Sequence, residues 1–263
     1  MSFRHRARKR FGQNFLVDGN IIARMIRAIA PEPGQQLVEI GPGLGALTLP
    51  LLQAVGRLQA VELDRDLVAE LARRCQGAGE LVIHQGDALR FDFASLRENE
   101  QPLRIVGNLP YNISTPLIFH LLDYADIIAD MHFTLQKEVV DRLAARVGDD
   151  AYGRLSVMVQ YHCRVERLFN IAPGAFRPVP QVDSAFVRLI PHRSKPIEVN
   201  DVAVFSRLVA QAFSQRRKTL RNTIKGLLDE EQIRAAGVDP ALRPEQVDLA
   251  GFAALAGQLP ARS

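Results

Sequence analysis

Apolar residues in the first part of the chain alternate between short continuous runs and segments with helical spacing. Residues 20–30 show helical spacing, and Asp18 stands where its side chain can cap the first turn. Short apolar runs predict strands at residues 35–40, 57–63 and 80–87, and the segments between them predict helices at residues 41–55 and 64–75. Such a βαβαβ series predicts a parallel sheet with helices on both faces.

The pattern continues to about residue 190 and then changes. Further strands are expected at residues 103–106, 131–136, 163–171 and 183–190, with helices at residues 115–122 and 137–147. A linker follows, and the remainder shows helical periodicity with Pro and Gly breaks but no clear strand. We therefore expect an α/β protein with a mostly parallel, seven-stranded, Rossmann-like sheet over residues 1–190 and a small all-α domain over residues 191–263.

Positive charge is concentrated in two short tracts. Residues 1–10 and 216–225 each carry five Lys or Arg and no Asp or Glu, out of 33 basic and 29 acidic residues in the chain. The rest of the chain therefore has a net charge of −6, against +4 for the whole. Local cations on an otherwise acidic chain are typical of proteins that bind a phosphate backbone, although each tract alone also fits a solvated helix face or a tail. Together they favour nucleic acid as the partner.

Composition narrows the remaining possibilities. No apolar run approaches the length that crosses a membrane, and the N-terminus lacks a secretory signal, so we expect a cytoplasmic protein with no membrane contact. Cys75 and Cys163 are far apart and form no CxxC pair, so neither a disulfide framework nor a metal site is indicated. We take a monomer as the default oligomeric state.

The segment EIGPGLGALT places Gly41, Gly43 and Gly45 between an expected strand and an expected helix. Missing Cβ atoms let backbone approach a ligand there. No Lys-Ser/Thr follows, which excludes a P-loop, and the third glycine falls one residue early for the dinucleotide fingerprint. Alone, the turn also fits a tight strand-to-helix connection. Glu62 and Asp87 favour a site, because each ends a later strand, where Glu62 can accept the ribose hydroxyls of an adenosine-bearing cofactor and Asp87 can contact its adenine.

The segment GNLPYNIS follows the strand expected at residues 103–106. An exocyclic amine on adenine is a poor nucleophile, and acceptors on its hydrogens would activate it. The Asn108 side-chain oxygen can accept one N–H and the Pro110 carbonyl the other, while Tyr111 can stack on the base. This arrangement predicts catalysis by position and electrostatics, without a strong base.

Motifs along nearly the whole chain resemble one family. They are RFGQNFL, VEIGPGLGALT, VELDRD, GNLPYNIS, LQKEVVDRL, YGRLSV, FRPVPQVDSAFVRL and FSQRRKTLRN. In this order they are similar to the bacterial ribosomal RNA adenine dimethyltransferases, which are class I S-adenosylmethionine methyltransferases. The resemblance implies N6,N6-dimethylation of two adjacent adenosines near the 3′ end of small-subunit (16S) ribosomal RNA, with a role in small-subunit biogenesis and the ribosomal RNA or subunit precursor as partner.

The resemblance also implies roles for individual residues. Asn14 and Leu16 would contact the cofactor, Gly41 would lie under its methionine part with Gly43 in the same turn, and Asn108 would serve both cofactor and target. Glu62 would hold the ribose and Asp87 the adenine. Phe176 would pack against the target base opposite Tyr111, although its segment FRPVP also fits a rigid proline loop. The cations proposed to hold RNA are Arg216, Arg217 and Lys218.

Three other functions fit parts of the sequence. A dinucleotide-dependent dehydrogenase is disfavoured by the glycine spacing. A non-catalytic RNA-binding or assembly factor, or a transcription-factor relative, is disfavoured by the intact Asn108, Pro110 and Tyr111, although an assembly role is compatible with catalysis. A macrolide-resistance type of enzyme, which methylates large-subunit RNA, shares the catalytic motif, and only the resemblance of FSQRRKTLRN favours the small-subunit enzyme.

Overall fold

The structure is a computed structural model that describes residues 13–260, and contacts divide the chain into two compact units. The first contains the described residues up to Val140 together with Glu166–Pro191, and the second contains Asp141–Val165 and the described residues from His192 onward. This grouping differs from the single boundary expected at residue 190, because residues 141–165 group with the C-terminal helices. The basic tract at residues 1–10 lies outside the described residues.

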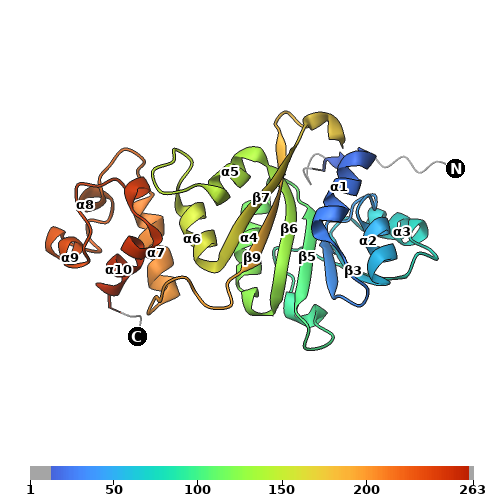
Figure 1. The fold of residues 1–263 in the computed structure, drawn as a ribbon, viewed down its shortest axis with the longest axis horizontal. Coiled ribbons are helices and arrows are strands. Elements are labelled where there is room, and N and C mark those ends of the chain that lie inside the picture. Colours follow the sequence, from blue (N-terminus) through green and yellow to red (C-terminus); the bar gives the residue numbers. More distant parts are fainter. Residues whose placement is uncertain (1–12, 261–263) are drawn as a thin grey trace. The chain divides into compact units, whose positions relative to one another are not determined.

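A seven-stranded sheet runs through the first unit in the order β4-β3-β2-β5-β6-β9-β7 (Figure 1). Neighbouring strands from β4 to β6 are parallel, and β9 pairs with β6 antiparallel. The strands are β2 Leu37–Ile40, β3 Arg57–Glu62, β4 Glu80–Gln85, β5 Leu103–Asn108, β6 Ile128–Gln136, β7 Cys163–Ile171 and β9 Ser184–Pro191. The expected mostly parallel, seven-stranded sheet is confirmed.

α-Helices follow strands β2, β3 and β5, as the apolar spacing predicts, whereas only a short 3-10 helix, Phe93–Leu96, lies between β4 and β5. The cap expected at Asp18 is confirmed, because its side chain accepts hydrogen bonds from the first-turn amides, and Asp64 caps the third helix in the same way. The helices are α1 Gly19–Ile29, α2 Thr48–Val55, α3 Arg65–Arg74, α4 Ser114–Leu122 and α5 Lys137–Ala144. One small sheet was not expected from the sequence: β1 (Phe15–Leu16) pairs antiparallel with β8 (Phe176–Arg177). Each of these strands has two residues, which is too short for a recognisable pattern.

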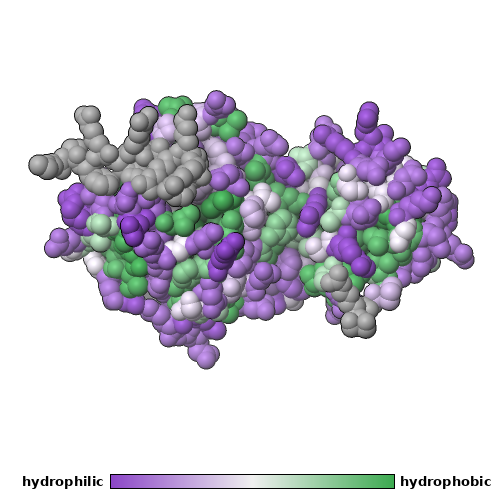
Figure 2. Space-filling view, turned by 180° about the vertical axis from the view of Figure 1, so that it is seen from behind, coloured by the Kyte–Doolittle hydropathy of each residue, from purple (hydrophilic) through white to green (hydrophobic). Residues whose placement is uncertain are grey.

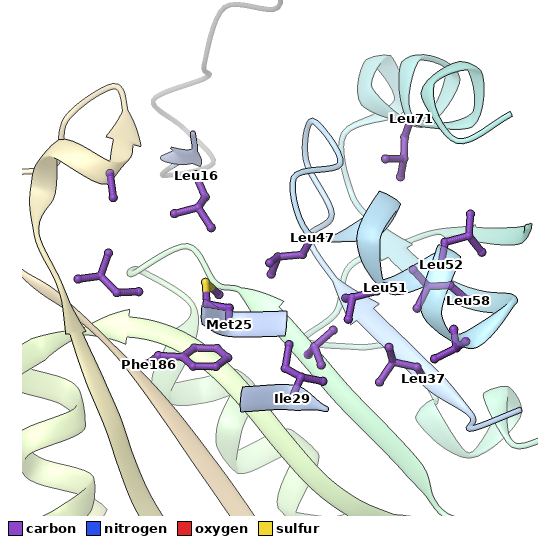
Figure 3. Packing of buried hydrophobic residues seen from close by; sticks show 14 of the residues in the cluster. Leu16, Met25, Ile29, Leu37, Leu47, Leu51, Leu52, Leu58, Leu71 and Phe186 are labelled. Atoms are coloured by element: carbon purple, nitrogen blue, oxygen red, sulfur yellow. The ribbon is translucent and has the colours of Figure 1, made fainter. Parts of the chain in front are cut away.

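The core beneath the glycine turn is built from α1, α2 and the sheet. Met25 and Ile29 come from one face of α1, and Leu51 from α2 lies close to them over Leu37 of β2 (Figure 3). Leu16 of β1 belongs to the same cluster, so the short N-terminal strand is attached to the sheet by buried apolar contacts. This packing holds the segment before α1 beside the strand ends.

The second unit is helical among its described residues, apart from the first residues of β7. Its helices are α6 Arg154–His162, α7 Val202–Ala212, α8 Leu220–Thr223, α9 Glu230–Ala235 and α10 Leu249–Gly257. Tyr152 links residues 141–165 to the C-terminal helices, because its ring packs against Phe213 and its hydroxyl donates to the Val247 carbonyl. Protruding side chains on the visible face of this unit are mostly hydrophilic (Figure 2). None of the helices in the described part of the chain is long and apolar enough to cross a membrane.

Candidate active site

Polar residues gather where four parallel strands end. Strands β2, β3, β4 and β5 are neighbours in the sheet, so their carboxyl ends lie at one edge. A cleft at this edge is lined by Gly41, Glu62, Asp87 and Asn108, one from or just after each strand. Open α/β sheets bind ligands at this edge. The structure thus brings together the four positions that the sequence predicts.

The glycine turn forms the floor of the cleft. Gly41 and Gly43 have φ angles of 65° and 56°, in the left-handed region that glycine adopts without a steric cost. A Cβ atom on Gly41 would have no atom within 4 Å, whereas one on Gly43 would lie 3.1 Å from the Phe15 ring. The turn therefore leaves open space beside Gly41 and closely contacts the N-terminal segment at Gly43. That open space is suited to a ligand group resting on the backbone.

Glu62 ends β3 and is almost fully buried. Its two carboxylate oxygens accept hydrogen bonds from the amides of Gly43, at 3.2 Å, and Asp64, at 2.8 Å. Burial raises the pKa of this carboxyl, while the two backbone amides counteract the rise. Each oxygen keeps a further lone pair, so the carboxylate is positioned to accept a pair of ligand hydroxyls.

Asp87 follows β4 and is exposed at the cleft. Its Oδ1 accepts a hydrogen bond from the Leu89 amide at 3.0 Å, which fixes the turn after the strand. Ala88 and Leu89 add apolar surface to the cleft wall beside it. A carboxylate next to apolar surface suits a flat heterocycle with a polar edge.

Asn108 is the last residue of β5 and connects the cleft to the N-terminal segment. Its Nδ2 donates a hydrogen bond to the Asn14 carbonyl at 2.8 Å, across 94 positions of sequence. This bond fixes the orientation of the amide, because the nitrogen faces Asn14 and the side-chain oxygen keeps its acceptor capacity. Asn14 thus contributes its backbone to the site, and Leu16 contributes buried packing two residues later.

Pro110 and Tyr111 continue the same wall of the cleft. The Pro110 carbonyl accepts the Ile113 amide at 3.2 Å and retains one lone pair. The Tyr111 hydroxyl and the Ser184 hydroxyl are 2.6 Å apart, so a residue of β9 holds the tyrosine ring. Burial raises the pKa of Tyr111, and the bond to Ser184 partly offsets this. The ring is therefore a neutral, positioned aromatic surface.

Phe176 does not line the cleft in this structure. Its side chain is 1% exposed and packs in the same hydrophobic cluster as Leu16, its partner across the β1-β8 pair. The contact with a target base that the resemblance implies stays a prediction. Tertiary packing explains the burial of Phe176, because a large aromatic side chain is stabilised when it leaves water for an apolar cluster.

The cationic tract, defined here as Arg216, Arg217 and Lys218, belongs to the second unit. It follows α7, and all three side chains are exposed. None of the three has an ion pair with another described residue, so their charges are accessible to an anionic partner.

Three of the cleft residues, and one buried residue that holds a cleft wall, were missed from the sequence. Gln13 and Phe15 flank Asn14, and the Gln13 amide lies 3.5 Å from an Asp64 carboxylate oxygen. Ser184 carries no local signal, because only the antiparallel pairing of β6 with β9 brings that strand beside the site. Glu39 had a usable signal, since it is a charged residue inside the apolar run LVEI immediately before the glycine turn.

A Rossmann-like sheet with a glycine-floored cleft and an Asn-Leu-Pro-Tyr wall has the architecture of the class I methyltransferases. Comparison with known proteins agrees with this class and narrows it. The family model "Ribosomal RNA adenine dimethylase" matches residues 4–256. This chain belongs to the ribosomal RNA adenine dimethylase family.

Individual relatives cover almost the whole chain. A Pseudomonas aeruginosa protein named "Ribosomal RNA small subunit methyltransferase A" is 61% identical over 257 residues, covering 98% of this chain and 96% of that protein. A Marinomonas protein of the same name is 56% identical over 252 residues, covering 96% of this chain and 95% of its own length. A crystal structure of a dimethyladenosine transferase from Plasmodium falciparum superposes with a TM-score of 0.77 at 27% identity, covering 92% of this chain and 95% of that one.

The fold is also shared with an enzyme of different stated substrate. The crystal structure of the 23S rRNA methyltransferase ErmE has a TM-score of 0.72 at 25% identity, covering 94% of this chain and 99% of that one. Fold similarity therefore does not tell small-subunit from large-subunit RNA as the substrate. The relatives with much higher sequence identity to this chain are proteins named for the small subunit.

Proposed function

We propose that the protein transfers methyl groups from S-adenosylmethionine to the N6 atoms of two adjacent adenosines near the 3′ end of small-subunit ribosomal RNA, giving N6,N6-dimethyladenosine. One observation supports this most strongly. Asn108, Pro110 and Tyr111 form a wall of the same cleft whose floor is the glycine turn. Family membership and the names of relatives at 56–61% identity support the choice of chemistry and of subunit.

The cleft residues fit S-adenosylmethionine. The open space beside Gly41 would take its methionine part, the free lone pairs of Glu62 would accept the ribose hydroxyls, and Asp87 would meet the adenine. Asn14, Leu16 and Asn108 would close the cleft from the N-terminal side. Bound there, the donor supplies a sulfonium methyl group, an electrophile that needs no metal to react.

Asn108 and Pro110 would activate the target amine. The adenosine must leave its stack to reach the cleft, as enzymes acting on bases require. Its two N6 hydrogens would then be accepted by the Asn108 side-chain oxygen and by the Pro110 carbonyl. These two acceptors draw the nitrogen towards a tetrahedral geometry with its lone pair available, and the proton released after transfer passes to solvent.

Three contacts in the structure prepare this arrangement. The Asn14 carbonyl holds the Asn108 amide, so that its oxygen and not its nitrogen is the group available to the target. The Ile113 amide holds the Pro110 carbonyl, and the Ser184 hydroxyl holds the Tyr111 ring that would stack on the base. Such preorganisation lowers the barrier because the groups need not reorient during reaction. A contact of Phe176 with the base would require its ring to leave the hydrophobic cluster.

RNA capture is assigned to the cationic tract of the second unit. Its exposed cations would neutralise backbone phosphates without reading sequence. This supports an RNA partner, and it leaves selection of the two adenosines to the shape of the ribosomal RNA around them.

Asn108→Ala tests the proposal directly. The variant loses the side-chain acceptor but keeps Glu62 and the glycine turn, so methyl transfer to small-subunit RNA should fall at least about a hundredfold, in the range found for loss of one preorganised group. Calorimetry should show an affinity for S-adenosylmethionine within a few fold of wild type. Asn112→Ala is the matched control, because Asn112 is an exposed asparagine of the same cleft with no part in the scheme. Near-normal transfer by Asn108→Ala would refute the activation scheme.

The substrate is tested separately. Mass spectrometry of ribosomal RNA from cells with and without the gene should show loss of the dimethyladenosine pair from the small subunit only. Loss of a modification from large-subunit RNA instead would assign the protein to the activity in the name of the ErmE structure.

A further inference from the structure

Glu39 is a buried acid in the wall of the cleft that the proposed mechanism does not use. It lies in β2, two residues before Gly41, and its side chain is 2% exposed. Its Oε2 has no hydrogen-bond partner among residues 13–260, although it is fully buried. A charged carboxylate in such a place would be strongly destabilised. The group is therefore neutral in the ligand-free protein at neutral pH.

The described residues around Glu39 offer no compensating positive charge. The residues paired with it on β3 and β5, Ala60 and Val106, are both apolar. Burial raises the pKa of Glu39 to about 8, and the nearby Glu62 on β3 adds to this rise. The Thr48 hydroxyl on α2 lowers the pKa, although it does not have the geometry of a full hydrogen bond to Glu39.

A second titratable group lies near Glu39 at the end of α3. Burial raises the pKa of the Cys75 thiol, with a further rise from Glu39, while Arg74 lowers it. Arg74 itself is engaged elsewhere, with the Glu70 carboxylate and the Leu44 carbonyl. Among residues 13–260, the titratable groups near Glu39 are thus Glu62 and the Cys75 thiol, and neither is cationic. A cationic ligand in the cleft would supply a positive charge that these groups do not.

We propose that Glu39 senses the charge of the methyl donor: the cationic donor binds with release of the Glu39 proton to solvent, and the neutral product binds with that proton retained. This inference rests on the proposed function. Donor and product differ by one methyl group and one positive charge on sulfur. An opposite charge within a few ångströms favours the ionised form of a carboxyl, and that effect is strong inside a protein.

The proton exchange separates donor from product. A newly ionised Glu39 attracts the sulfonium ion, so the donor gains affinity that the product lacks. After transfer the sulfur is neutral, and the buried carboxylate takes up a proton from solvent because it would otherwise be an uncompensated charge. Glu39 thereby favours exchange of spent product for fresh donor between the two methylation rounds that one base needs.

Calorimetry measures the proposed proton directly. Binding of S-adenosylmethionine and of S-adenosylhomocysteine is measured at pH 7 in two buffers of different ionisation enthalpy, with wild type and with Glu39→Gln. Wild type should release nearly one more proton with the donor than with the product, since a group with a pKa of about 8 is about nine-tenths protonated at pH 7. Protons from the ligands' ammonium groups or from Glu62 would be released in Glu39→Gln as well, so the difference between the two proteins isolates Glu39.

The affinities give a second readout. From pH 6 to pH 8 the donor affinity of wild type, taken relative to Glu39→Gln, should rise about tenfold per pH unit and level off above pH 8. The product should show no such relative rise. Equal proton release for donor and product in wild type would overturn the inference even if Glu39→Gln failed to fold. Absence of binding by either ligand would instead contradict the proposed function.

Discussion

Replacing His132 with phenylalanine should remove a loss of stability that the wild-type protein suffers in mild acid. His132 lies in the middle of β6, is 0% exposed, and packs its ring against Phe186 at a centroid distance of 5.9 Å. Neither ring nitrogen has a hydrogen-bond partner among the described residues. Its charged neighbours are Asp130 on the same strand and the two arginines that hold Asp130 by hydrogen bonds, Arg104 and Arg188.

These surroundings keep the imidazole neutral. Burial lowers the pKa of His132 to about 4 from its usual 6.5; Asp130 opposes the shift, while Arg104 and Arg188 add to it. The pKa is lower in the folded than in the unfolded state, so the unfolded chain binds more protons as the pH falls below 6.5, and stability falls with it. Between pH 7.5 and pH 4.5 the two pKa values correspond to a loss of about 2.5 kcal/mol in the free energy of unfolding.

Urea unfolding followed by far-ultraviolet circular dichroism at these two pH values tests the argument. The loss between pH 7.5 and pH 4.5 should be about 2.5 kcal/mol smaller in His132→Phe than in wild type. His132→Gln is the control, because it also cannot ionise but packs differently. The two variants should differ in absolute stability and agree in the size of the reduction. If wild type and both variants lose the same stability on acidification, His132 is not held neutral by its surroundings.

Three further predictions concern binding and catalysis. Replacing all three cations of the cationic tract with glutamine should reduce the slope of log Kd for ribosomal RNA against log salt by about 2 to 3, because each phosphate contact contributes about 0.7 to 0.9 to that slope. An unchanged slope in a filter-binding assay would exclude contact of the tract with phosphates. Glu62→Ala should raise the Kd for S-adenosylmethionine at least about tenfold, since two charge-assisted hydrogen bonds to the ribose are lost; equal affinity by calorimetry would make this acid purely structural. Ser184→Ala should lower kcat about fivefold with donor affinity unchanged, because the Tyr111 ring loses a hydrogen bond of about 1 kcal/mol; an unaltered kcat in a methyl-transfer assay would remove Ser184 from the positioning of the base.

Several features of this protein could be inferred from local sequence. The strands β2 to β5 are short apolar runs. The spacing of their apolar residues and their composition identify them without knowledge of the strands they pair with. The cleft residues that directly follow those strands could be placed for the same reason. Parallel strands joined by helices must end at one edge, so Gly41, Glu62, Asp87 and Asn108 had to converge once the alternation was recognised.

Contacts between distant segments lie beyond such reasoning. The bond from Asn108 to the Asn14 carbonyl, the pairing of β1 with β8, and the link from Tyr111 to Ser184 each join residues more than 70 positions apart. The burial of Phe176 and the grouping of residues 141–165 with the C-terminal helices are of the same kind. The physical reason is that local propensity selects a helix or a strand, whereas burial and long-range hydrogen bonding depend on which surfaces meet in the folded chain. Glu39 depends on both the sequence and the fold. The sequence shows an acidic residue inside an apolar run, but only the described fold, with no cation around the buried carboxyl, makes the group neutral.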